Sequence, residues 1–459
     1  MDKALFTFEE ILQATGGTSV GEKKTGVSVC SVSTDTRKPM PGALFIALRG
    51  ESFDAHAFLA NAVERGAAVL CVEKSSGAPL PPGIPIVAVD STEKAYQDLA
   101  RFHRMRFPAL RVAALTGSCG KTSTKEALRA IFNHVYGNDH VLATEGNTNN
   151  QVGVPANLLK LEQRHKIAVL EAGTSHFGEI EPLARCIRPD HAMIVSIRSS
   201  HIENLGSLEG IASEKSHIFG ELPTNGGGVI PFRCAGNDIL REALKGHRIL
   251  TFGTEEEADY RAEYLGGNLR GASFRLIRKE TGETAEVNWS VPGEHQAVNA
   301  AGAAALASFF GISLADAAEG LKGTTLPGMR MRIAEHGGAT WINDAYNANP
   351  DSMKASLLWL KEFADASRLV LVLGDMGEQG DRAPEAHADV IRFARDNFPA
   401  ARIVAVGPMM SEAGKGIADS SFASSAEAKN LPVKPGDLVF LKASRSTRLE
   451  LVEPENWIC

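Results

Sequence analysis

The chain has 459 residues, of which 44% are apolar and 22% are charged. These values exclude disordered and fibrous proteins and predict about three domains of ordinary size. The formal charge of −7 argues against nonspecific nucleic-acid binding, which needs a basic surface. The N-terminal MDKALFTFEEILQ lacks the features of a signal peptide, no apolar run is long enough to span a membrane, and the six cysteines show no metal-binding spacing. We therefore expect a reduced protein of the cytoplasm, without nucleic-acid or membrane partners.

Short apolar runs alternate with helical patterns, which predicts an α/β fold in which helices cover parallel sheets. The runs expected to be buried parallel strands are Val112–Leu115, Ile167–Glu171, Ala192–Ile197, Leu369–Gly374 and Ile403–Gly407. After Lys121 the apolar residues fall on one helical face, which indicates an amphipathic helix.

Two composition changes suggest domain boundaries. Ser75–Pro85 is rich in Ser, Gly and Pro, and a helical segment follows near Thr92–His103. The second change, at Gly323–Arg330, follows an alanine-rich helical segment over Val298–Phe310. We therefore predict domains at about 1–88, 89–325 and 326–459.

The segment TGSCGKTS joins the first of these strands to the amphipathic helix and predicts a phosphate-binding loop. Its candidate nucleotide-binding residues are Gly117, Ser118, Cys119, Gly120, Lys121, Thr122 and Ser123. The pattern is a short G-x-x-G-K-T variant, because Leu115 stands where the usual loop has its first glycine. The alternative is an ordinary tight turn with a surface lysine. Nearby N–H groups and Lys121 are expected to favour the Cys119 thiolate, unless Cys119 is a small filler residue that points away.

Three further residues lie where metal or phosphate chemistry could use them. Glu171 ends a predicted central strand, where an acid can face a Mg²⁺ ion at the loop, although a helix cap or a surface position is equally compatible. His201 follows the next strand at the same edge, but a lone histidine is more often structural. Lys215 lies on a predicted helix, and its alternative is a solvated lysine paired with a nearby glutamate.

Two amide-rich segments are candidates for binding a sugar, a phosphate or a peptide. Thr144–Pro155 contains Asn147, Asn149 and Asn150, and simple turn chemistry is its alternative. Asn343–Met353 follows a short strand-like run and contains Asp344 and Asn347.

Taken together, these segments resemble the Mur ligase family, and within it the members that add D-alanyl-D-alanine. The matching blocks, in family order, are SVSTDTRKPMPGALFIALRGESFDAHAF, LTGSCGKTSTKE, TEGNTNNQVGVP, LEAGTSHFGEI, PGEHQAVNA, NDAYNANPDSM, LGDMGEQG and LKASRSTRLE. The resemblance implies an N-terminal α/β domain for the nucleotide-sugar, a central P-loop ATPase with a parallel sheet and a C-terminal Rossmann-like domain. It implies an enzyme that uses ATP to join D-alanyl-D-alanine to UDP-N-acetylmuramoyl-tripeptide through an acyl phosphate, giving a precursor of peptidoglycan. We expect a monomer, and other oligomeric states stay open.

The resemblance also implies roles for individual residues. The implied catalytic residues are Lys121, Glu171, His201 and Lys215. Thr122, Glu171, His201 and Lys215 would face two Mg²⁺ ions, with Lys215 a candidate for carbamylation. The implied ATP-binding residues beyond the loop are His295, Asn299, Arg330, Asp344 and Asn347. The implied substrate-binding residues are Ser33, Asp35, Arg37, Asp54, His56, Phe58, Asn147, Asn149, Asn150, Lys442, Ser444 and Arg445.

Two other functions stay open. A sister ligase that adds the third amino acid usually carries a DNPR-like run, whereas NDAYNANP stands in the comparable region here. A nucleotide-binding switch without ligase activity would not be expected to keep Lys121, Glu171, His201 and Lys215 together. For the ligase itself, both meso-diaminopimelate and L-lysine are open as the third residue of the tripeptide.

Overall fold

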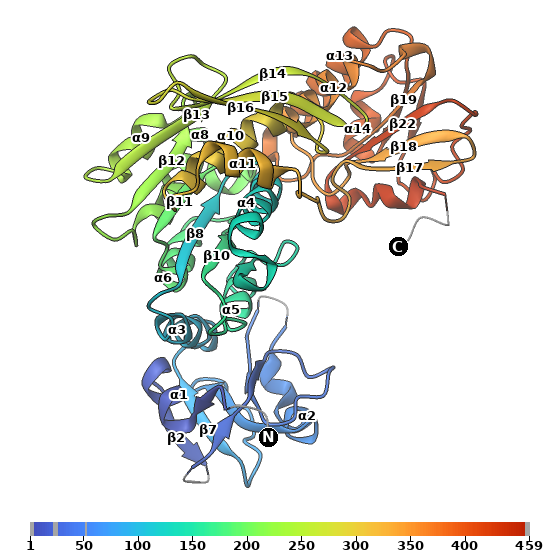
Figure 1. The fold of residues 1–459 in the computed structure, drawn as a ribbon. Helices are drawn as coiled ribbons and strands as arrows, with labels where there is room; N and C mark the ends of the chain where they lie inside the picture. Colours follow the sequence, from blue (N-terminus) through green and yellow to red (C-terminus); the bar gives the residue numbers. More distant parts are fainter. Residues whose placement is uncertain (1–3, 22–25, 51–52, 455–459) are drawn as a thin grey trace. The chain divides into compact units, whose positions relative to one another are not determined.

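The computed structural model describes residues 4–21, 26–50 and 53–454 (Figure 1). The chain divides into two compact units. Unit 1 comprises Met1–Leu110, Thr148–His165 and Pro182–Arg188, and unit 2 comprises Arg111–Asn147, Lys166–Glu181 and Pro189–Cys459.

Unit 1 is built on a five-stranded sheet with the order β2-β7-β6-β5-β4, next to a two-stranded sheet of β1 and β3. The strands are β1 (Phe6–Thr7), β2 (Thr18–Gly21), β3 (Ser28–Val29), β4 (Ser31–Ser33), β5 (Ala43–Ile46), β6 (Ala67–Glu73) and β7 (Pro85–Val89). In the larger sheet all pairs are parallel except β2 with β7. Strands β5 and β7 are buried along their whole length, as parallel strands covered on both faces should be.

The helices of unit 1 are α1 (Phe8–Thr15), α2 (Leu59–Glu64), α3 (Thr92–Met105), α5 (Gly153–Leu158) and most of α6 (Ile180–Ile187), with the 3-10 turn η1 (Ala55–Phe58). Two of these helices, α1 and α3, begin at residues whose side chains cap them. Thr7 and Glu10 form a capping box at α1, and the Ser91 side chain accepts the Lys94 N–H at α3. These contacts satisfy N–H groups that a helix start leaves free, and so they fix where α1 and α3 begin.

Unit 2 contains a nine-stranded sheet with the order β16-β15-β14-β13-β12-β11-β8-β10-β9. The strands are β8 (Arg111–Thr116), β9 (Val141–Ala143), β10 (Ile167–Glu171), β11 (His191–Ile194), β12 (Gly227–Pro231), β13 (Arg248–Gly253), β14 (Tyr260–Asn268), β15 (Gly271–Arg278) and β16 (Glu283–Trp289). Pairing is parallel from β9 to β14 and antiparallel from β14 to β16. The order places β8 between β10 and β11, so the chain leaves β8 at the reversal point where α/β sheets bind ligands.

Three helices share the main core with this sheet. The helices around the sheet are α4 (Lys121–Tyr136), α7 (Ile202–Leu205), α8 (Leu208–Ser216), α9 (Asn237–Ala243), α10 (Glu294–Ser308) and α11 (Leu314–Leu321), with the turns η2 (Asn138–His140) and η3 (His217–Phe219). Leu128 and Phe132 of α4 pack with Ala304 of α10 and Leu321 of α11 in one buried cluster. The small residues of α10 bring it close to the strands: a Cβ on Gly302 would overlap Met193 and Phe252.

A six-stranded sheet with the order β17-β18-β22-β19-β20-β21 forms the C-terminal part of unit 2 (Figure 1). Its elements are β17 (Arg332–His336), β18 (Ala339–Asn343), α12 (Pro350–Lys361), η4 (Ala366–Arg368), β19 (Leu369–Gly374), η5 (Gly380–Arg382), α13 (Ala383–Asn397), β20 (Arg402–Val406), α14 (Pro408–Ala413), β21 (Ser420–Phe422), β22 (Leu438–Lys442), η6 (Arg445–Thr447) and η7 (Leu449–Val452). Only β17 and β18 pair antiparallel. Trp359 of α12 and Ile391 of α13 are buried with strand residues in one core, while Leu449 and Val452 belong to the core on the other side.

The predicted α/β class with parallel sheets is confirmed, and most predicted strands lie where expected. Ile167–Glu171 and Leu369–Gly374 match β10 and β19 residue for residue. The prediction of a strand over Ala192–Ile197 was too long, because β11 ends at Ile194 and Ser196 bonds to the phosphate-loop segment instead. No helix in the described part of the chain is long and apolar enough to cross a membrane.

Candidate functional site

The phosphate loop lies between β8 and the start of α4, as predicted. Gly117 and Gly120 both have positive φ angles, of 159° and 78°. A Cβ on Gly117 would come within 3.0 Å of the Ser196 nitrogen, and one on Gly120 within 2.8 Å of the Asn299 amide, so both positions need glycine. The loop therefore leads into the N-terminus of α4, where free backbone N–H groups and the helix dipole favour phosphate.

Ser196 holds the loop from the end of β11. Its hydroxyl accepts the Cys119 N–H at 2.9 Å and donates to the Cys119 carbonyl at 3.0 Å, while its carbonyl accepts the Ser118 N–H at 2.9 Å. The Lys121 ammonium donates to the Gly117 carbonyl at 2.6 Å. Lys121 thus folds back over the loop, and the alternative of a plain surface lysine does not describe it.

Thr122 joins the loop to two charged residues. Its hydroxyl donates to Glu171 Oε2 at 3.1 Å and accepts from the Arg330 guanidinium at 3.2 Å. Glu171 is 1% exposed, so it is not the surface residue that one alternative described. Arg330 also lies over the Tyr346 ring, with its guanidinium carbon 3.5 Å from the ring centroid. An acid and a guanidinium therefore meet at the helix start where phosphate would bind.

Lys215 lies near the C-terminal end of α8 and is completely buried. The alternative of a solvated lysine is therefore wrong. Its Nζ has no hydrogen-bond partner among the described residues, and burial, helped by the nearby charge of Lys121, lowers its pKa to about 7. A buried amine without a partner is costly, and such a group is typical of a functional site.

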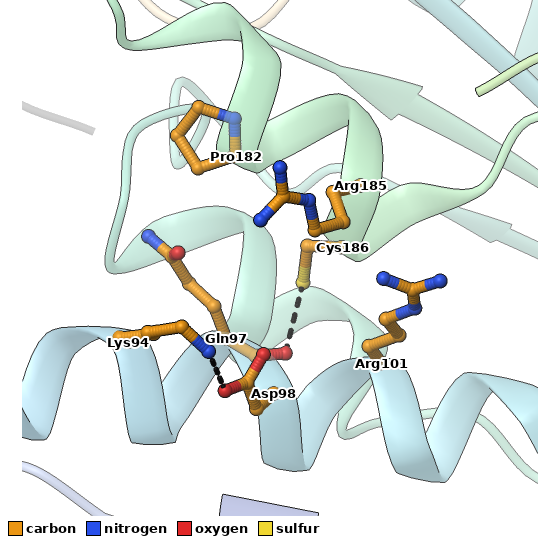
Figure 2. A pocket seen from close by; sticks show the side chains of 7 residues that line it. All are labelled: Lys94, Gln97, Asp98, Arg101, Pro182, Arg185 and Cys186. Atoms are coloured by element: carbon orange, nitrogen blue, oxygen red, sulfur yellow. Dashed lines mark hydrogen bonds and ion pairs between the residues drawn. The ribbon is translucent and has the colours of Figure 1, made fainter. Parts of the chain in front are cut away.

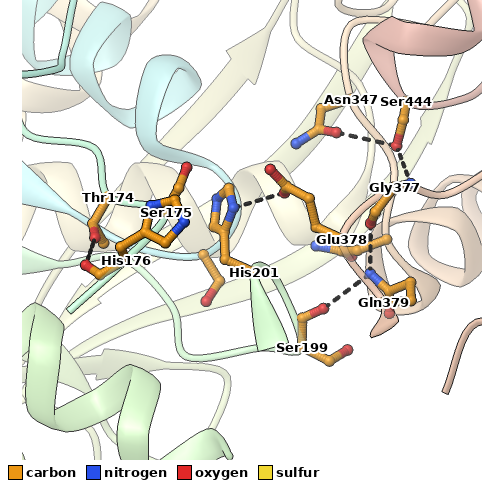
Figure 3. Close-up of polar contacts among 12 residues, drawn as sticks. Thr174, Ser175, His176, Ser199, His201, Asn347, Gly377, Glu378, Gln379 and Ser444 are labelled. Atoms are coloured by element: carbon orange, nitrogen blue, oxygen red, sulfur yellow. Dashed lines mark hydrogen bonds and ion pairs between the residues drawn. The ribbon is translucent and has the colours of Figure 1, made fainter. Parts of the chain in front are cut away.

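His201 immediately precedes α7 and meets the loop that follows β19 (Figure 3). Its Nδ1 lies 2.6 Å from Glu378 Oε2. The His201 ring, and more weakly Lys121, hold the pKa of the Glu378 carboxyl below its usual range. A second contact is made by the Gln379 amide, which donates to the Ser199 carbonyl at 3.3 Å.

The C-terminal part brings several predicted residues together. Lys442, which is 4% exposed, pairs with Asp344, and the Ser356 hydroxyl donates to the same carboxylate at 3.1 Å. The Ser444 hydroxyl lies 3.4 Å from Asn347 Oδ1. Residues assigned separately to ATP and to substrate therefore share one cluster.

The Arg445 guanidinium pairs instead with Glu450, outside that cluster, at 2.6 Å.

The Cys119 sulfur accepts a hydrogen bond from the Asn349 amide at 2.8 Å. Burial raises the pKa of the Cys119 thiol, and the opposing effects of Asn349 and Lys121 are smaller. Lys121 does favour the thiolate, as expected, but the larger effect of burial, which the sequence did not reveal, raises the pKa of the thiol.

His295 and Asn299 lie on the first turns of α10. Asn299 packs against Gly120, and its amide donates to Gln296 at 3.1 Å. Burial lowers the pKa of His295 to about 4, so the ring is neutral near neutral pH. Asn299 thus lies beside the loop, whereas the His295 ring is influenced by Asp344 and Lys442 of the C-terminal part.

In unit 1 the predicted substrate-binding residues form two local networks. Asp35 and Arg37 pair at 2.9 Å, and the Ser33 hydroxyl accepts the Asp35 N–H at 3.2 Å. Asp54 accepts from His56 Nδ1 at 2.6 Å, since His56 Nε2 accepts the Glu73 N–H at 2.9 Å.

These contacts have different consequences for solvent access. Both ring nitrogens of His56, which is 3% exposed, are used inside the unit. Phe58 is exposed and stacks on Phe53 with ring centroids 5.5 Å apart, which leaves an aromatic surface open to a ligand.

The predicted amide-rich segment supplies mainly turn contacts in its second half. Asn150 accepts the N–H groups of Val152 and Gly153, at 3.3 and 2.9 Å. Asn147 is exposed, and Asn149 is partly buried. The turn alternative therefore describes Asn150, and the roles of the other two stay predictions.

A separate cavity of about 220 Å³ lies in unit 1 between α3 and α6 (Figure 2). It is lined by Lys94, Gln97, Asp98, Arg101, Pro182, Arg185 and Cys186. The Cys186 thiol lies 3.4 Å from the Gln97 carbonyl, and burial raises its pKa. None of its lining residues is a predicted site residue, so this cavity is distinct from the phosphate loop.

The sequence predicted cysteines without metal-binding spacing and a reduced protein. Within residues 4–21, 26–50 and 53–454, no group of three or more His, Cys, Asp and Glu side chains could hold a metal ion. The described cysteines, Cys30, Cys71, Cys119, Cys186 and Cys234, are free, and Cys459 lies outside the described residues.

Comparison with known proteins agrees with this geometry. Residues 115–307 match the Mur ligase middle domain, and residues 329–445 match the Mur ligase, glutamate ligase domain. A UDP-N-acetylmuramoyl-tripeptide–D-alanyl-D-alanine ligase of Bacillus subtilis is 34% identical, over 97% of this chain and 96% of the relative. The chain belongs to the Mur ligase family.

Other Mur ligases extend the similarity to structures. A ligase of Escherichia coli with the same name as the Bacillus protein is 36% identical over 80% of this chain and 79% of its own. A crystal structure of MurF from Acinetobacter baumannii covers 97% of both chains, with a TM-score of 0.88 and 33% identity. MurF from Thermotoga maritima in complex with ADP has a TM-score of 0.78 and 25% identity, over 94% of this chain and 97% of its own.

Sequence reasoning missed three residues of this Mur ligase site. Ser196 fixes the loop, Asn349 contacts Cys119, and Glu378 contacts His201. These residues follow β11, β18 and β19, at the carboxyl ends of strands where α/β sheets bind ligands. That rule could have selected Glu378, which lies just beyond Leu369–Gly374.

Proposed function

We propose that this Mur ligase joins D-alanyl-D-alanine to UDP-N-acetylmuramoyl-tripeptide with the hydrolysis of ATP. The observation that carries the proposal is the meeting of Glu171 and Arg330 at the Thr122 hydroxyl, at 3.1 and 3.2 Å. The identity of the substrates is supported by the names of the Bacillus and Escherichia relatives. The ADP complex of the Thermotoga protein supports a nucleotide at the loop.

The residues of the site suit the formation of an acyl phosphate. The tripeptide carboxylate and the γ-phosphate are both anionic, so they approach each other only where positive charge and N–H groups are concentrated. Lys121, Arg330 and the start of α4 supply that charge. Attack by the dipeptide amine then forms the amide bond and releases phosphate.

Mg²⁺ fits the residues present at the loop. Proteins bind Mg²⁺ through one or two carboxylates together with substrate phosphates, so a ready-made cluster of acids is not needed. Glu171 with the Thr122 hydroxyl would hold one ion, and His201 with Lys215 would face a second. When bound, Mg²⁺ would neutralise charge on the phosphates.

Lys215 suits carbamylation. Its buried Nζ has no hydrogen-bond partner among the described residues, so an added group would meet no competing contact. Addition of CO₂ to the neutral amine, with loss of a proton, would replace a cation by an anion that can face a metal. Mass spectrometry under CO₂ would detect the added mass.

The remaining assignments are predictions that accompany this function. We expect a monomer of the cytoplasm, without nucleic-acid partners, with domains at about 1–88, 89–325 and 326–459. UDP would bind near Ser33, Asp35, Arg37, Asp54, His56 and Phe58. The substrate would also meet Lys442, Ser444 and Arg445 at the end of β22.

Phosphate release tests the proposal directly. Purified protein is given Mg-ATP and UDP-N-acetylmuramoyl-tripeptide, in the diaminopimelate and lysine forms, with and without D-alanyl-D-alanine. Release that needs the dipeptide, with a product heavier by that dipeptide, is the expected result. Release with a single amino acid would assign a sister ligase, and release that ignores the dipeptide would leave only a nucleotide-binding protein. Lys121→Ala, purified in parallel, accounts for contaminating ATPases.

A further inference from the structure

Two non-glycine residues with left-handed backbones face each other in the site. His201 has a φ of 57° and Glu378 a φ of 60°, and their side chains meet at 2.6 Å (Figure 3). A left-handed conformation costs a non-glycine residue about 1–2 kcal/mol, so it persists only where the surroundings impose it. Such strain in both partners of one contact indicates a function for the pair.

Fixed contacts on both sides direct the Glu378 carboxylate. The preceding residue, Gly377, donates its N–H to the Ser444 hydroxyl at 2.8 Å. The following residue, Gln379, uses its amide to reach the Ser199 carbonyl at 3.3 Å and the Gly377 carbonyl at 3.0 Å. The loop after β19 is thus held in place while the carboxylate itself remains accessible, since the Glu378 side chain is 45% exposed.

Other acids of the site are occupied or enclosed. Asp344 takes the Lys442 ammonium and the Ser356 hydroxyl, and Glu171 is 1% exposed against Thr122. Glu378 differs, because it combines exposure with contact to His201 at the edge of the phosphate site.

An anionic group at this place would help the acceptor substrate to bind. The dipeptide's α-amino group is largely an ammonium at neutral pH, since its usual pKa is about 8. It must come within about 3–3.5 Å of the acyl carbon, in a region where Lys121 and Arg330 repel cations. A carboxylate beside that region would offset the repulsion and hold the ammonium near the acyl carbon, and the ammonium loses one proton to solvent before its nitrogen attacks.

We propose that Glu378 binds the amino group of the incoming dipeptide, which takes the place of His201 as the partner of the carboxylate. The proposal rests on the proposed ligase function and adds the residue that recognises the acceptor substrate. The loop after β19 would then select ligands that have a free amino group. A dipeptide analogue without that group should bind equally well with or without the Glu378 carboxylate.

The test compares Glu378→Gln with wild type and with Glu203→Gln. Glu203 is exposed on α7 and lies beside Gly380, so its variant removes the same charge close to the same loop. Initial rates of phosphate release give the KM for each substrate. Dissociation constants are measured for propanoyl-D-alanine, which is D-alanyl-D-alanine without its amino group.

The expected result is specific to the amine. In Glu378→Gln the KM for D-alanyl-D-alanine rises roughly tenfold or more, as for the loss of a hydrogen bond to a charged group. The KM values for ATP and tripeptide, the binding of propanoyl-D-alanine and the melting temperature stay at wild-type values. Glu203→Gln behaves as wild type throughout.

Other results would overturn the proposal. An unchanged KM for the dipeptide, or equal weakening of propanoyl-D-alanine, would show that Glu378 does not read the amine. A changed requirement for ATP or Mg²⁺ alone would assign Glu378 to the phosphates, and faster turnover would make it a blocking group. Wild type without dipeptide-dependent phosphate release would instead contradict the proposed function, so the two failures are distinguishable.

Discussion

A buried histidine next to the central strand gives a prediction about acid stability. His191 in β11 is 8% exposed, and its Nδ1 accepts the Gly227 N–H at 3.0 Å. Its ring stacks on Phe309 with centroids 4.6 Å apart. Burial, with a smaller effect of Arg111, lowers the pKa of His191 to about 4 from an ordinary value of 6.5. The folded protein therefore holds this ring neutral at pH values where the unfolded chain protonates it.

The sign and size of the effect follow from this difference. Above pH 6.5 the ring is neutral in both states and costs nothing. As the pH falls from 6.5 to about 4, the unfolded state binds a proton that the folded state does not, so stability is lost. Each pH unit costs about 1.4 kcal/mol, which gives about 2 kcal/mol by pH 5 and about 3 kcal/mol by pH 4.

His191→Gln isolates this contribution. Glutamine keeps an oxygen that can accept the Gly227 N–H but does not titrate. The variant also loses the ring stacking on Phe309, but this lowers the free energy of unfolding equally at every pH. The difference between the two proteins should therefore change with pH only through protonation of His191. Urea unfolding of both proteins is measured from pH 7 to pH 5, with exposed His336→Gln as a control for the loss of a surface imidazole.

We expect the stability advantage of wild type over His191→Gln to shrink by about 2 kcal/mol across that range. A difference that stays constant with pH would refute the reasoning. So would an NMR titration of ¹³C-labelled histidine in which the His191 signal, assigned by its absence from the variant, moves near pH 6.5.

Three further predictions concern the site itself. Lys121→Ala should lower the rate of phosphate release by about 10²–10³, as for the loss of an oxyanion-hole donor, and a normal rate would refute its role. Lys215→Ala should be nearly inactive and partly rescued by added formate if a carbamate is used, whereas full activity would exclude a role for this lysine. Cys119 should react slowly with maleimide at neutral pH and faster as the pH rises, because burial raises its pKa; peptide mass spectrometry follows the labelling, and rapid labelling at neutral pH would contradict the expectation.

Local signals explain what the sequence predicted well. Leu369–Gly374 is a short run of branched apolar residues, which is typical of a strand buried on both faces, and it forms β19. The glycines and Lys121 of the phosphate loop lie in one continuous segment, so neighbouring residues alone carry the pattern. Glu171 was predicted to face the loop because both lie at the carboxyl ends of adjacent parallel strands, and it contacts Thr122.

The errors concern properties that depend on distant residues. The sequence of α8 does not reveal that Lys215 is enclosed, because its neighbours in space come from other elements. The same holds for Cys119, whose thiol pKa is raised by burial that no nearby residue announces. His201 and Glu378 are far apart in sequence, so their contact required the arrangement of two sheets.

That arrangement also brings together side chains from two sets of loops. The phosphate loop follows β8, Glu171 ends β10, and His201 follows β11. In the other sheet, Asp344, Glu378 and Ser444 follow β18, β19 and β22. The Glu378 side chain is 45% exposed, so water reaches its carboxylate at the contact with His201, and a contact that solvent screens in this way typically contributes about 0–1 kcal/mol. A ligand can displace a pair of this strength, whereas it could not displace a large apolar interface. An enzyme that must admit ATP, a nucleotide-sugar peptide and a dipeptide to the same place needs contacts that substrates can replace, and Glu378 is the side chain on which that exchange can be measured.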